Sequence, residues 1–403
     1  MADATSETGQ HRGSILEGVD GFGTHPQPVY AGMRAGGPAR RAHATAVIVS
    51  TRSAIDDVLR HPEDFSSVMP LGRLGNVRPL IPIEVDPPDQ KKFRKLLDPL
   101  FAPQKMALLE EPVRVLVNRL IDDFGDASEI DFARQFSVPL PSQVFLTLLG
   151  LPLEDLPKFL AMKDGIIRPF HVLGVSHGDP ACIEYQQQTG QSIYDYFDAI
   201  LDEREREPRD DLLSHFLSVE VDGDRLSRTD ILDICFLFLI AGLDTVTSSL
   251  ECFFAFLAEH PEHRAQLVAD PAITPKAVEE LLRWETPVML VSRRATRDTE
   301  IQGCPVHAGD EVYTFLGSAN TDDAEFPDAD VVRFDRDENR HITFGGGVHR
   351  CLGSHLARLE LRVALTEWHR RIPDYRIAPG ADLDFTVGVR SLDAFPMILG
   401  ESI

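Results

Sequence analysis

The sequence predicts a mainly α fold with a small β subdomain. Apolar residues recur at helical spacing through most of the chain, whereas alternating, strand-like stretches are short and gather towards the C-terminus. A hydrophobic content of 43% and a charged content of 26% are typical of a soluble protein with a large core. Residues 1–25 show no periodicity, so we expect a flexible lead-in followed by a single domain over 26–403.

The first half of the chain is expected to form a short strand and a series of helices. Residues 47–50 read as a strand, and 51–60 as a helix that ends before His61-Pro62. Further helices are expected at 89–100, 103–124, 140–149, 153–162 and 185–206. The segments 66–84 and 164–180 mix glycine, proline and apolar residues, so we expect two mobile loops that open and close an access route.

A long helix dominates the second half. Ser227 and Asp230 form a capping-box pattern at its start, and it ends near His260. The run 234–243 is apolar on all faces, so the middle of this helix should be buried. A shorter helix is expected over 274–285, and strands at 300–306, 311–313 and 384–399.

Charge and cysteine usage exclude several classes of protein. A net charge of −24 argues against binding nucleic acid, whose phosphates would repel the chain. The N-terminus lacks the apolar core of a signal peptide, and the longest apolar run, ten residues, is too short to span a membrane, so we expect a cytoplasmic protein. The five cysteines are scattered and odd in number, which does not suggest disulfides.

The loop of residues 344–353, which reads FGGGVHRCLG, carries the strongest chemical signal. Cys351 precedes a helical pattern, where unpaired N–H groups and the helix dipole favour a thiolate. Gly345, Gly347 and Gly353 let the backbone approach the sulfur. The loop therefore predicts a socket for a thiolate metal ligand. Two alternatives are a buried structural cysteine, and a zinc site that would add nearby histidines, His341, His349 and His355.

The pattern Phe344-Gly345-x-Gly347-x-His349-x-Cys351-x-Gly353 resembles the haem-binding loop of the cytochromes P-450. The resemblance runs from about residue 30 to the C-terminus and implies the cytochrome P-450 fold, with 26–403 as one catalytic domain. It implies haem b with Cys351 as the axial iron ligand. It also implies that His349 donates to a haem propionate and that Phe344 shields the sulfur.

An acid and an alcohol interrupt the apolar run of the long helix. An ionisable side chain in such a run is costly unless it is paired or functional, and Gly242 leaves room for a ligand to approach. The stretch Ala241-Gly242-Leu243-Asp244-Thr245 resembles the acid–alcohol pair of the family, which relays protons during oxygen activation. The alternative is a helix kink with a capping Asp.

Three further sets of residues follow from the resemblance. Glu280 and Arg283, three residues apart, resemble the Glu-x-x-Arg motif of the family, and Arg333 fits as the partner of this structural cluster. The expected propionate ligands besides His349 are Gln90, which stands where many members have His, Arg94, and Arg293, with Arg294 as a possible substitute. The expected substrate pocket is apolar and is lined by the two long loops and by Leu237, Ile240, Ala241, Val288, Met289 and Val291.

A basic island predicts the redox partner. Four of the seven lysines lie within fifteen residues, and Lys91, Lys92 and Lys95 belong to this group. We expect it to dock an acidic ferredoxin, served by an NAD(P)H-dependent ferredoxin reductase, because the chain holds no reductase module. The alternative is an ordinary solvated helix face.

The sequence thus predicts a monomeric haem-thiolate monooxygenase that hydroxylates or epoxidises a hydrophobic small molecule such as a fatty-acyl lipid, terpenoid or steroid. A tailoring oxidase for a polyketide or carrier-bound substrate is one alternative. A non-catalytic haem sensor or carrier is an alternative of another class. A fatty-acid peroxygenase fits less well, because that group lacks the relay of Asp244 and Thr245.

Overall fold

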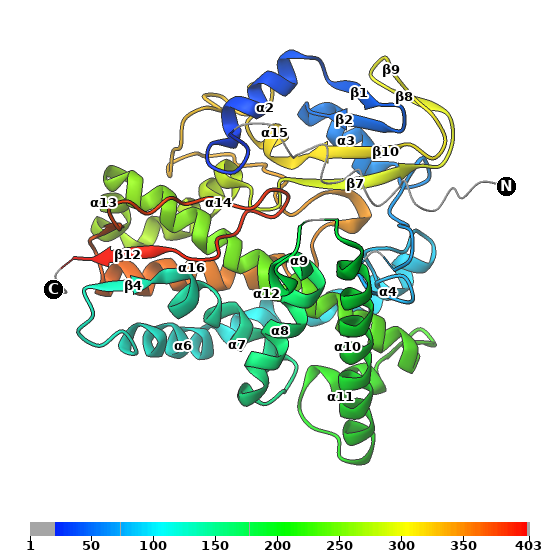
Figure 1. Cartoon of the computed structure of the whole chain (residues 1–403), viewed down its shortest axis with the longest axis horizontal. Coiled ribbons are helices and arrows are strands. Elements are labelled where there is room, and N and C mark those ends of the chain that lie inside the picture. Colours follow the sequence, from blue (N-terminus) through cyan, green and yellow to red (C-terminus); the bar gives the residue numbers. More distant parts are fainter. Residues whose placement is uncertain (1–20, 73, 177, 401–403) are drawn as a thin grey trace. The chain divides into compact units, whose positions relative to one another are not determined.

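The computed structural model describes residues 21–72, 74–176 and 178–400, so most of the predicted N-terminal lead-in lies outside the described residues. Helices hold most of the ordered residues and the strands form small sheets (Figure 1), which confirms the predicted fold class. The chain divides into two compact units. The described part of unit 1 comprises 67–100 and 142–243, and that of unit 2 comprises 21–66, 101–141 and 244–400.

Unit 1 is built from helices and one small hairpin. Its elements are α4 (Asp89–Leu97), α8 (Leu156–Ile167), α9 (Pro169–Leu173), α10 (Pro180–Arg206), α11 (Leu212–Ser218), β5 (Glu220–Val221) and β6 (Asp224–Arg225), with most of α7 (Pro139–Leu148). The rings of Phe159 and Tyr196 join α8 to α10 at a centroid distance of 5.1 Å. The predicted loop 164–180 is wrong in part, because it contains the end of α8 and all of α9.

Unit 2 carries the larger sheets. Its helices are α2 (Pro26–Ala35), α3 (Arg52–Arg60), α5 (Pro103–Met106), α6 (Glu110–Asp122), α13 (Pro261–Ala269), α14 (Thr274–Glu285), α15 (Leu316–Asn320) and α16 (Ser354–Arg371). A five-stranded sheet has the order β1 (Ala39–His43), β2 (Ala46–Val49), β10 (Glu311–Phe315), β7 (Leu290–Ala295), β3 (Phe65–Ser66). The smaller sheets are β11 (Tyr375–Ile377), β12 (Pro396–Leu399), β4 (Glu129–Asp131) and the hairpin β8 (Thr299–Ile301), β9 (Cys304–Val306).

Two predicted elements of unit 2 differ from the structure. The stretch expected as one helix over 103–124 is broken, because a 3₁₀ turn at Ala107–Leu109 separates α5 from α6. The alternating stretch 384–399 forms a strand only at its end, in β12. Before it the chain turns back on itself, and the N–H of Thr386 donates to the carbonyl of Ser391 at 3.0 Å. The alternating pattern of residues 384–399 therefore covers a turn as well as a strand.

The long helix α12 (Arg228–Glu259) matches its prediction in start, end and capping. The N–H of Ser227 donates to Asp230 Oδ2 at 2.8 Å, and the N–H of Asp230 donates to Ser227 Oγ at 3.1 Å, which is the reciprocal capping box. By length and composition α12 could cross a membrane, yet 67% of its most apolar window is buried in the protein, as in a core helix.

A stripe along the middle of α12 is less buried than the residues on either side of it. Leu239 and Leu243 are buried, whereas Leu237 and Ile240 are half-buried and Ala241 is exposed. These three residues recur at helical spacing and form one stripe. The prediction that the middle of the helix is buried on all sides is therefore wrong along this stripe.

Candidate haem-thiolate site

Cys351 differs from the other cysteines by its exposure. Its side chain is exposed on the loop that precedes α16, whereas Cys182, Cys235, Cys252 and Cys304 are buried. Burial raises the pKa of the Cys235 thiol, which therefore stays neutral. The N–H of Cys351 donates to the carbonyl of Phe344 at 2.9 Å and closes the loop. Exposure removes the alternative of a buried structural cysteine.

Glycines shape the loop that carries Cys351. Gly345 and Gly347 have φ values of +69° and +64°, which side chains disfavour. A Cβ atom at Gly347 would lie 2.0 Å from the carbonyl oxygen of Leu59, at the end of α3. Only glycine therefore lets the loop rest on α3. An exposed thiol on a loop that rests on α3 fits a thiolate ligand for a large flat cofactor.

Asn320 holds the start of the loop in place. Its Oδ1 accepts a hydrogen bond from the N–H of Ile342 at 2.7 Å, and its Nδ2 donates to Thr343 Oγ1 at 2.9 Å. The Thr343 hydroxyl in turn donates to the carbonyl of Leu282 at 2.7 Å, at the end of α14. All these groups are buried, so the loop is fixed to α14 and α15. No sequence signal pointed to Asn320.

A second missed cluster supports Phe344. The guanidinium of Arg358, on α16, lies 4.4 Å from the ring centroid of Phe344. The same group donates to Glu279 at 2.7 and 2.8 Å, and His341 Nε2 lies 3.0 Å from Glu279. Burial raises the pKa of Glu279, but the hydrogen bonds from His341 and Arg358 outweigh this effect and lower it to about 2. Glu279 is therefore a permanent carboxylate.

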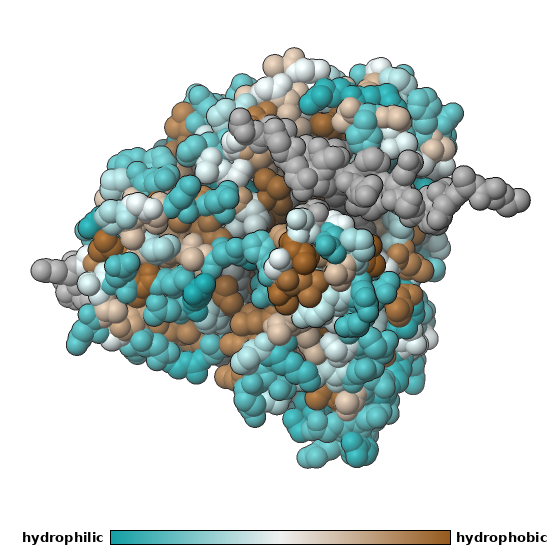
Figure 2. Space-filling view, in the orientation of Figure 1, coloured by the Kyte–Doolittle hydropathy of each residue, from teal (hydrophilic) through white to brown (hydrophobic). Residues whose placement is uncertain are grey.

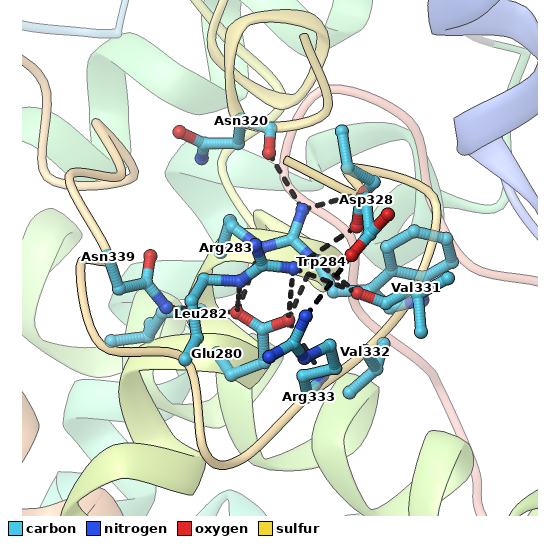
Figure 3. A network of polar contacts seen from close by, with 12 residues as sticks. Glu280, Leu282, Arg283, Trp284, Asn320, Asp328, Val331, Val332, Arg333 and Asn339 are labelled. Carbon is cyan, nitrogen blue, oxygen red and sulfur yellow. Dashed lines mark hydrogen bonds and ion pairs between the residues drawn. The ribbon is translucent and has the colours of Figure 1, made fainter. Parts of the chain in front are cut away.

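The Glu-x-x-Arg motif forms a buried ion cluster on α14 (Figure 3). Arg283 donates to both carboxylate oxygens of Glu280 at 2.9 and 2.8 Å, and both side chains are fully buried. Arg333 was predicted as the third member, but its side chain turns to Asp328 at the exposed edge and only its N–H donates to Glu280, at 2.9 Å. The buried guanidinium that completes the cluster is Arg336, 3.1 Å from Glu280. Arg336 corrects this assignment.

The acid and the alcohol of α12 have different surroundings. Asp244 is buried at 3% exposure, and Thr245 is half-buried on the same side as the open stripe. The carbonyls of both residues accept hydrogen bonds at 2.8 Å from the hydroxyls one turn later, Ser248 and Ser249. Hydroxyl-to-carbonyl bonds of this kind often bend a helix, yet α12 remains one continuous α-helix from Arg228 to Glu259.

The alternation of side chains along β7 separates the two candidate arginines, Arg293 and Arg294. Arg293 points to the buried face, and Arg294 points to the exposed face. Val291 is half-buried, as is Val288 before the strand. Met289 is fully buried and its sulfur accepts a hydrogen bond from the N–H of Gly388 at 3.3 Å, so it belongs to the packing and not to an open wall. This corrects its place in the expected pocket.

The propionate candidates and the docking candidates of unit 1 lie on α4. Gln90 is buried, and Arg94 forms an ion pair with Asp98 at 2.7 Å. Lys91 is exposed, and the half-buried Lys92 has its amine 5.7 Å from the centre of the Phe93 ring. Lys95 pairs with Asp222, which is exposed, at 2.5 Å. The basic island is therefore partly engaged with its own surroundings.

The donor set favours haem over zinc. Within 21–72, 74–176 and 178–400, no three His, Cys, Asp or Glu side chains gather as a metal-binding group. His341 is engaged with Glu279 instead. Unit 2 thus presents a single exposed thiol in a rigid loop, an acid–alcohol pair and a buried arginine on β7. These residues fit a haem held by one sulfur.

Comparison with known proteins leads to the same kind of site. The family model described as Cytochrome P450 matches residues 40–371. The chain is 35% identical to the Steroid C26-monooxygenase of Mycolicibacterium smegmatis, covering 87% of this chain and 86% of the relative. It is 31% identical to the Vitamin D(3) 25-hydroxylase of Pseudonocardia autotrophica, covering 99% of both. The structure of P450BioI in complex with hexadec-9Z-enoic acid ligated Acyl Carrier Protein is similar at a TM-score of 0.86 and 25% identity, covering 94% of this chain and 99% of that chain.

The names of these relatives describe oxygen-inserting enzymes, which favours catalysis over a non-catalytic haem carrier. Motif, loop geometry and overall likeness lead to the same assignment. The chain belongs to the cytochrome P450 family, and it is a haem-thiolate monooxygenase.

Proposed function

We propose that this enzyme hydroxylates a steroid-like or other lipid substrate in the cytoplasm, with electrons from a separate ferredoxin. The observation that carries the proposal is the open apolar stripe of Leu237, Ile240 and Ala241, which leads along α12 towards Thr245. An apolar wall that ends at a proton donor suits a substrate with little polarity. The names of the steroid and vitamin D relatives support the same substrate class.

Each predicted residue has a role in this proposal. Cys351 binds the haem iron through its sulfur, while His349, Arg293, Arg94 and Gln90 hold the propionates. When bound, haem b supplies the redox chemistry that inserts one atom of O2 into a C–H bond or a double bond.

The protein's own part in the reaction is positioning and proton transfer. Asp244 in its protonated form would pass a proton to Thr245 Oγ1, which would donate its own on the substrate side of α12, and Asp244 would then take up a proton from solvent. Ser248 and Ser249 donate hydrogen bonds at 2.8 Å to the backbone carbonyls of the pair and so hold these carbonyls within α12.

A spectroscopic screen tests the substrate class. Steroids, terpenes and fatty acids of similar size would be titrated into the haem-loaded protein, and the shift of the haem absorption from low spin to high spin would be recorded. We expect steroids or long-chain lipids to give the tightest binding. Hydroxylated products must then appear with a ferredoxin system. Binding confined to small polar molecules would contradict the proposal.

Replacing the sulfur tests the thiolate. Cys351→Ala should abolish the absorption of the carbon monoxide complex that is characteristic of haem-thiolate proteins. The matched control is Cys182→Ala, a buried cysteine in unit 1, which should keep the full spectrum. An unchanged spectrum in Cys351→Ala would place the iron on another residue.

We propose that the partner is an acidic ferredoxin that docks at α4. Changing Lys91, Lys92 and Lys95 to Gln together should slow reduction at low salt several-fold, as measured by stopped-flow absorbance. Lys158→Gln, an exposed lysine of α8, is the control and should leave the rate unchanged. Equal rates in all three proteins would show that this face is an ordinary solvated surface.

A carrier-bound acyl substrate is the second candidate. Apolar side chains gather over α9 (Figure 2), where Val172 is 48% and Leu173 is 37% exposed. Such a surface fits a protein partner. The structural likeness to P450BioI with its acyl carrier protein favours the same possibility. If acyl carrier protein gives a larger spin shift than the free acid, and Val172→Ser removes the difference, this candidate replaces the first.

A further inference from the structure

Segment 67–88 of unit 1, described except for residue 73, holds most of the predicted access loop 66–84 and touches α10 through two glycines. A Cβ atom at Gly75 would lie 2.1 Å from the carbonyl oxygen of Gln186, and one at Gly190 would lie 2.3 Å from the carbonyl oxygen of Gly75. Real Cβ atoms do not approach backbone oxygens this closely. The two backbones can meet only because both positions lack side chains.

Arg78 ties the same segment to two helices. Its Nε lies 2.9 Å from Asp233 Oδ2 and 3.1 Å from Oδ1, so the segment is joined to α12. Its guanidinium also lies 4.8 Å from the ring centroid of Tyr194, on α10. The Asp233 side chain is only 4% exposed, whereas that of Arg78 is 37% exposed. The carboxylate is therefore part of the interior, and the arginine is the part that can leave.

The tip of the segment is internally rigid. Asn76 Nδ2 donates to the carbonyl of Arg78 at 2.9 Å and to Glu84 Oε2 at 3.2 Å. The same Glu84 oxygen accepts the N–H of Leu80 at 2.9 Å. A tip that carries its own hydrogen bonds can move as one piece when the Arg78 contact breaks.

We propose that Arg78 and Asp233 are positioning residues whose ion pair latches segment 67–88 onto α10 and α12 and so sets how long the substrate is held. The inference rests on the proposed function and on the sequence-based expectation that loop 66–84 lines the substrate pocket. Releasing the latch leaves the buried Asp233 carboxylate without its guanidinium, which is unfavourable until water reaches it. The closed arrangement therefore persists until a substrate or a thermal fluctuation offsets that cost.

Asp233→Asn tests the latch, because it removes the charge and keeps the shape. Hydrogen–deuterium exchange of residues 74–84 in the haem-loaded protein should become about tenfold faster, as expected for the loss of a charged hydrogen bond. Dissociation of phenylimidazole, followed by stopped-flow absorbance, should accelerate by a similar factor. Asp211→Asn is the matched control, since that aspartate is also 4% exposed and pairs with an arginine, Arg204, at 2.5 Å.

Gly190→Ala is a second variant that acts without any charge. Alanine favours a helix over glycine by about 1 kcal/mol, so α10 alone should gain stability. The new methyl group nevertheless collides with the carbonyl of Gly75, and we expect the segment to lift. Exchange of 74–84 should therefore rise while the thermal midpoint of the protein stays equal or increases. A general loss of stability cannot produce this combination.

The latch is overturned if Asp233→Asn and Gly190→Ala exchange like the wild type, or if Asp211→Asn accelerates exchange of 74–84 and ligand release to the same extent. Arg78→Lys should fall between wild type and Asp233→Asn, because it keeps the charge but loses the two-oxygen contact. If the exchange results hold and no steroid or lipid binds, the latch stands and the proposed substrate class fails.

Discussion

The proposed proton relay of α12, formed by Asp244 and Thr245, would act at the scale of single atoms. Asp244 is buried and Thr245 faces the open stripe, so the two side chains cannot substitute for each other. Thr245→Ala should keep substrate binding and the consumption of reduced nicotinamide, but should divert most of the oxygen to peroxide. Asp244→Asn should lower turnover about 100-fold or more, as expected for the loss of a group that transfers protons. Peroxide and product are measured in the same reaction, and tight coupling in Thr245→Ala would contradict its role.

Glu360 is a buried acid that predicts how stability depends on pH. It lies on α16, burial raises its pKa to about 8, and its Oε2 has no hydrogen-bond partner among the described residues. A glutamate in an unfolded chain has a pKa of about 4.3. Between these values the folded protein holds an extra proton, so the stability present at low pH is lost as the pH rises towards 8.

Glu360→Gln should remove this dependence. Urea unfolding should show the variant gaining stability over the wild type between about pH 5 and about pH 8. Glu367 lies on the same helix. Burial raises its pKa, but hydrogen bonds from Asn118, Arg370 and Arg114 outweigh this effect, so the pKa is lowered overall. Its Gln variant should therefore lose stability at neutral pH and approach the wild type in acid. Parallel pH trends in the two variants would show that Glu360 is ionised in the folded protein.

At the scale of elements, the Glu280 cluster joins α14 to the chain that leads into the cysteine loop. Glu280 also accepts a hydrogen bond from Asn339 Nδ2 at 3.0 Å, three residues before the loop is fixed by Asn320. Glu280→Gln leaves buried guanidinium groups uncompensated and should cost about 3–5 kcal/mol of unfolding free energy. Denaturant unfolding and haem retention measure this. Arg333→Gln, whose side chain is exposed, should leave the unfolding free energy close to that of the wild type.

Sequence reasoning succeeded where a pattern carries its own physical cause. The capping box predicted the start of α12. The loop glycines predict a close approach of the backbone to the sulfur, whereas the close approach that Gly347 makes is to the carbonyl oxygen of Leu59. Sequence reasoning failed where partners come from distant segments. Spacing does not reveal that Arg336 rather than Arg333 turns inward, or that Asn320 and Arg358 support the loop, because folding alone brings these residues together.

At the scale of the whole molecule, the net charge of −24 would oppose the proposed acidic ferredoxin, while the lysines of α4 would attract it. At about 0.01 M salt the Debye length is about 30 Å, so the partner feels the whole charge. At about 0.15 M salt the Debye length is about 8 Å, so the partner feels only the lysines of α4 next to it. We therefore expect the reduction rate to pass through a maximum at intermediate salt. A rate that only rises with salt would mean that repulsion dominates and that the lysines do not guide docking.

The three glycines at 345 to 347 differ in whether they can be replaced by a residue with a side chain. Gly347 is blocked by the backbone of Leu59, and Gly345 by its left-handed conformation, but Gly346 is extended at φ −152° and a methyl group there would meet Leu59 Cδ1 at 3.5 Å, an ordinary contact. An engineer who wishes to tune the redox potential of the iron thus has one replaceable position in this run. Substitutions at 346 should change the contact between the loop and Leu59 while Gly345 and Gly347 keep the loop that carries Cys351 in its conformation.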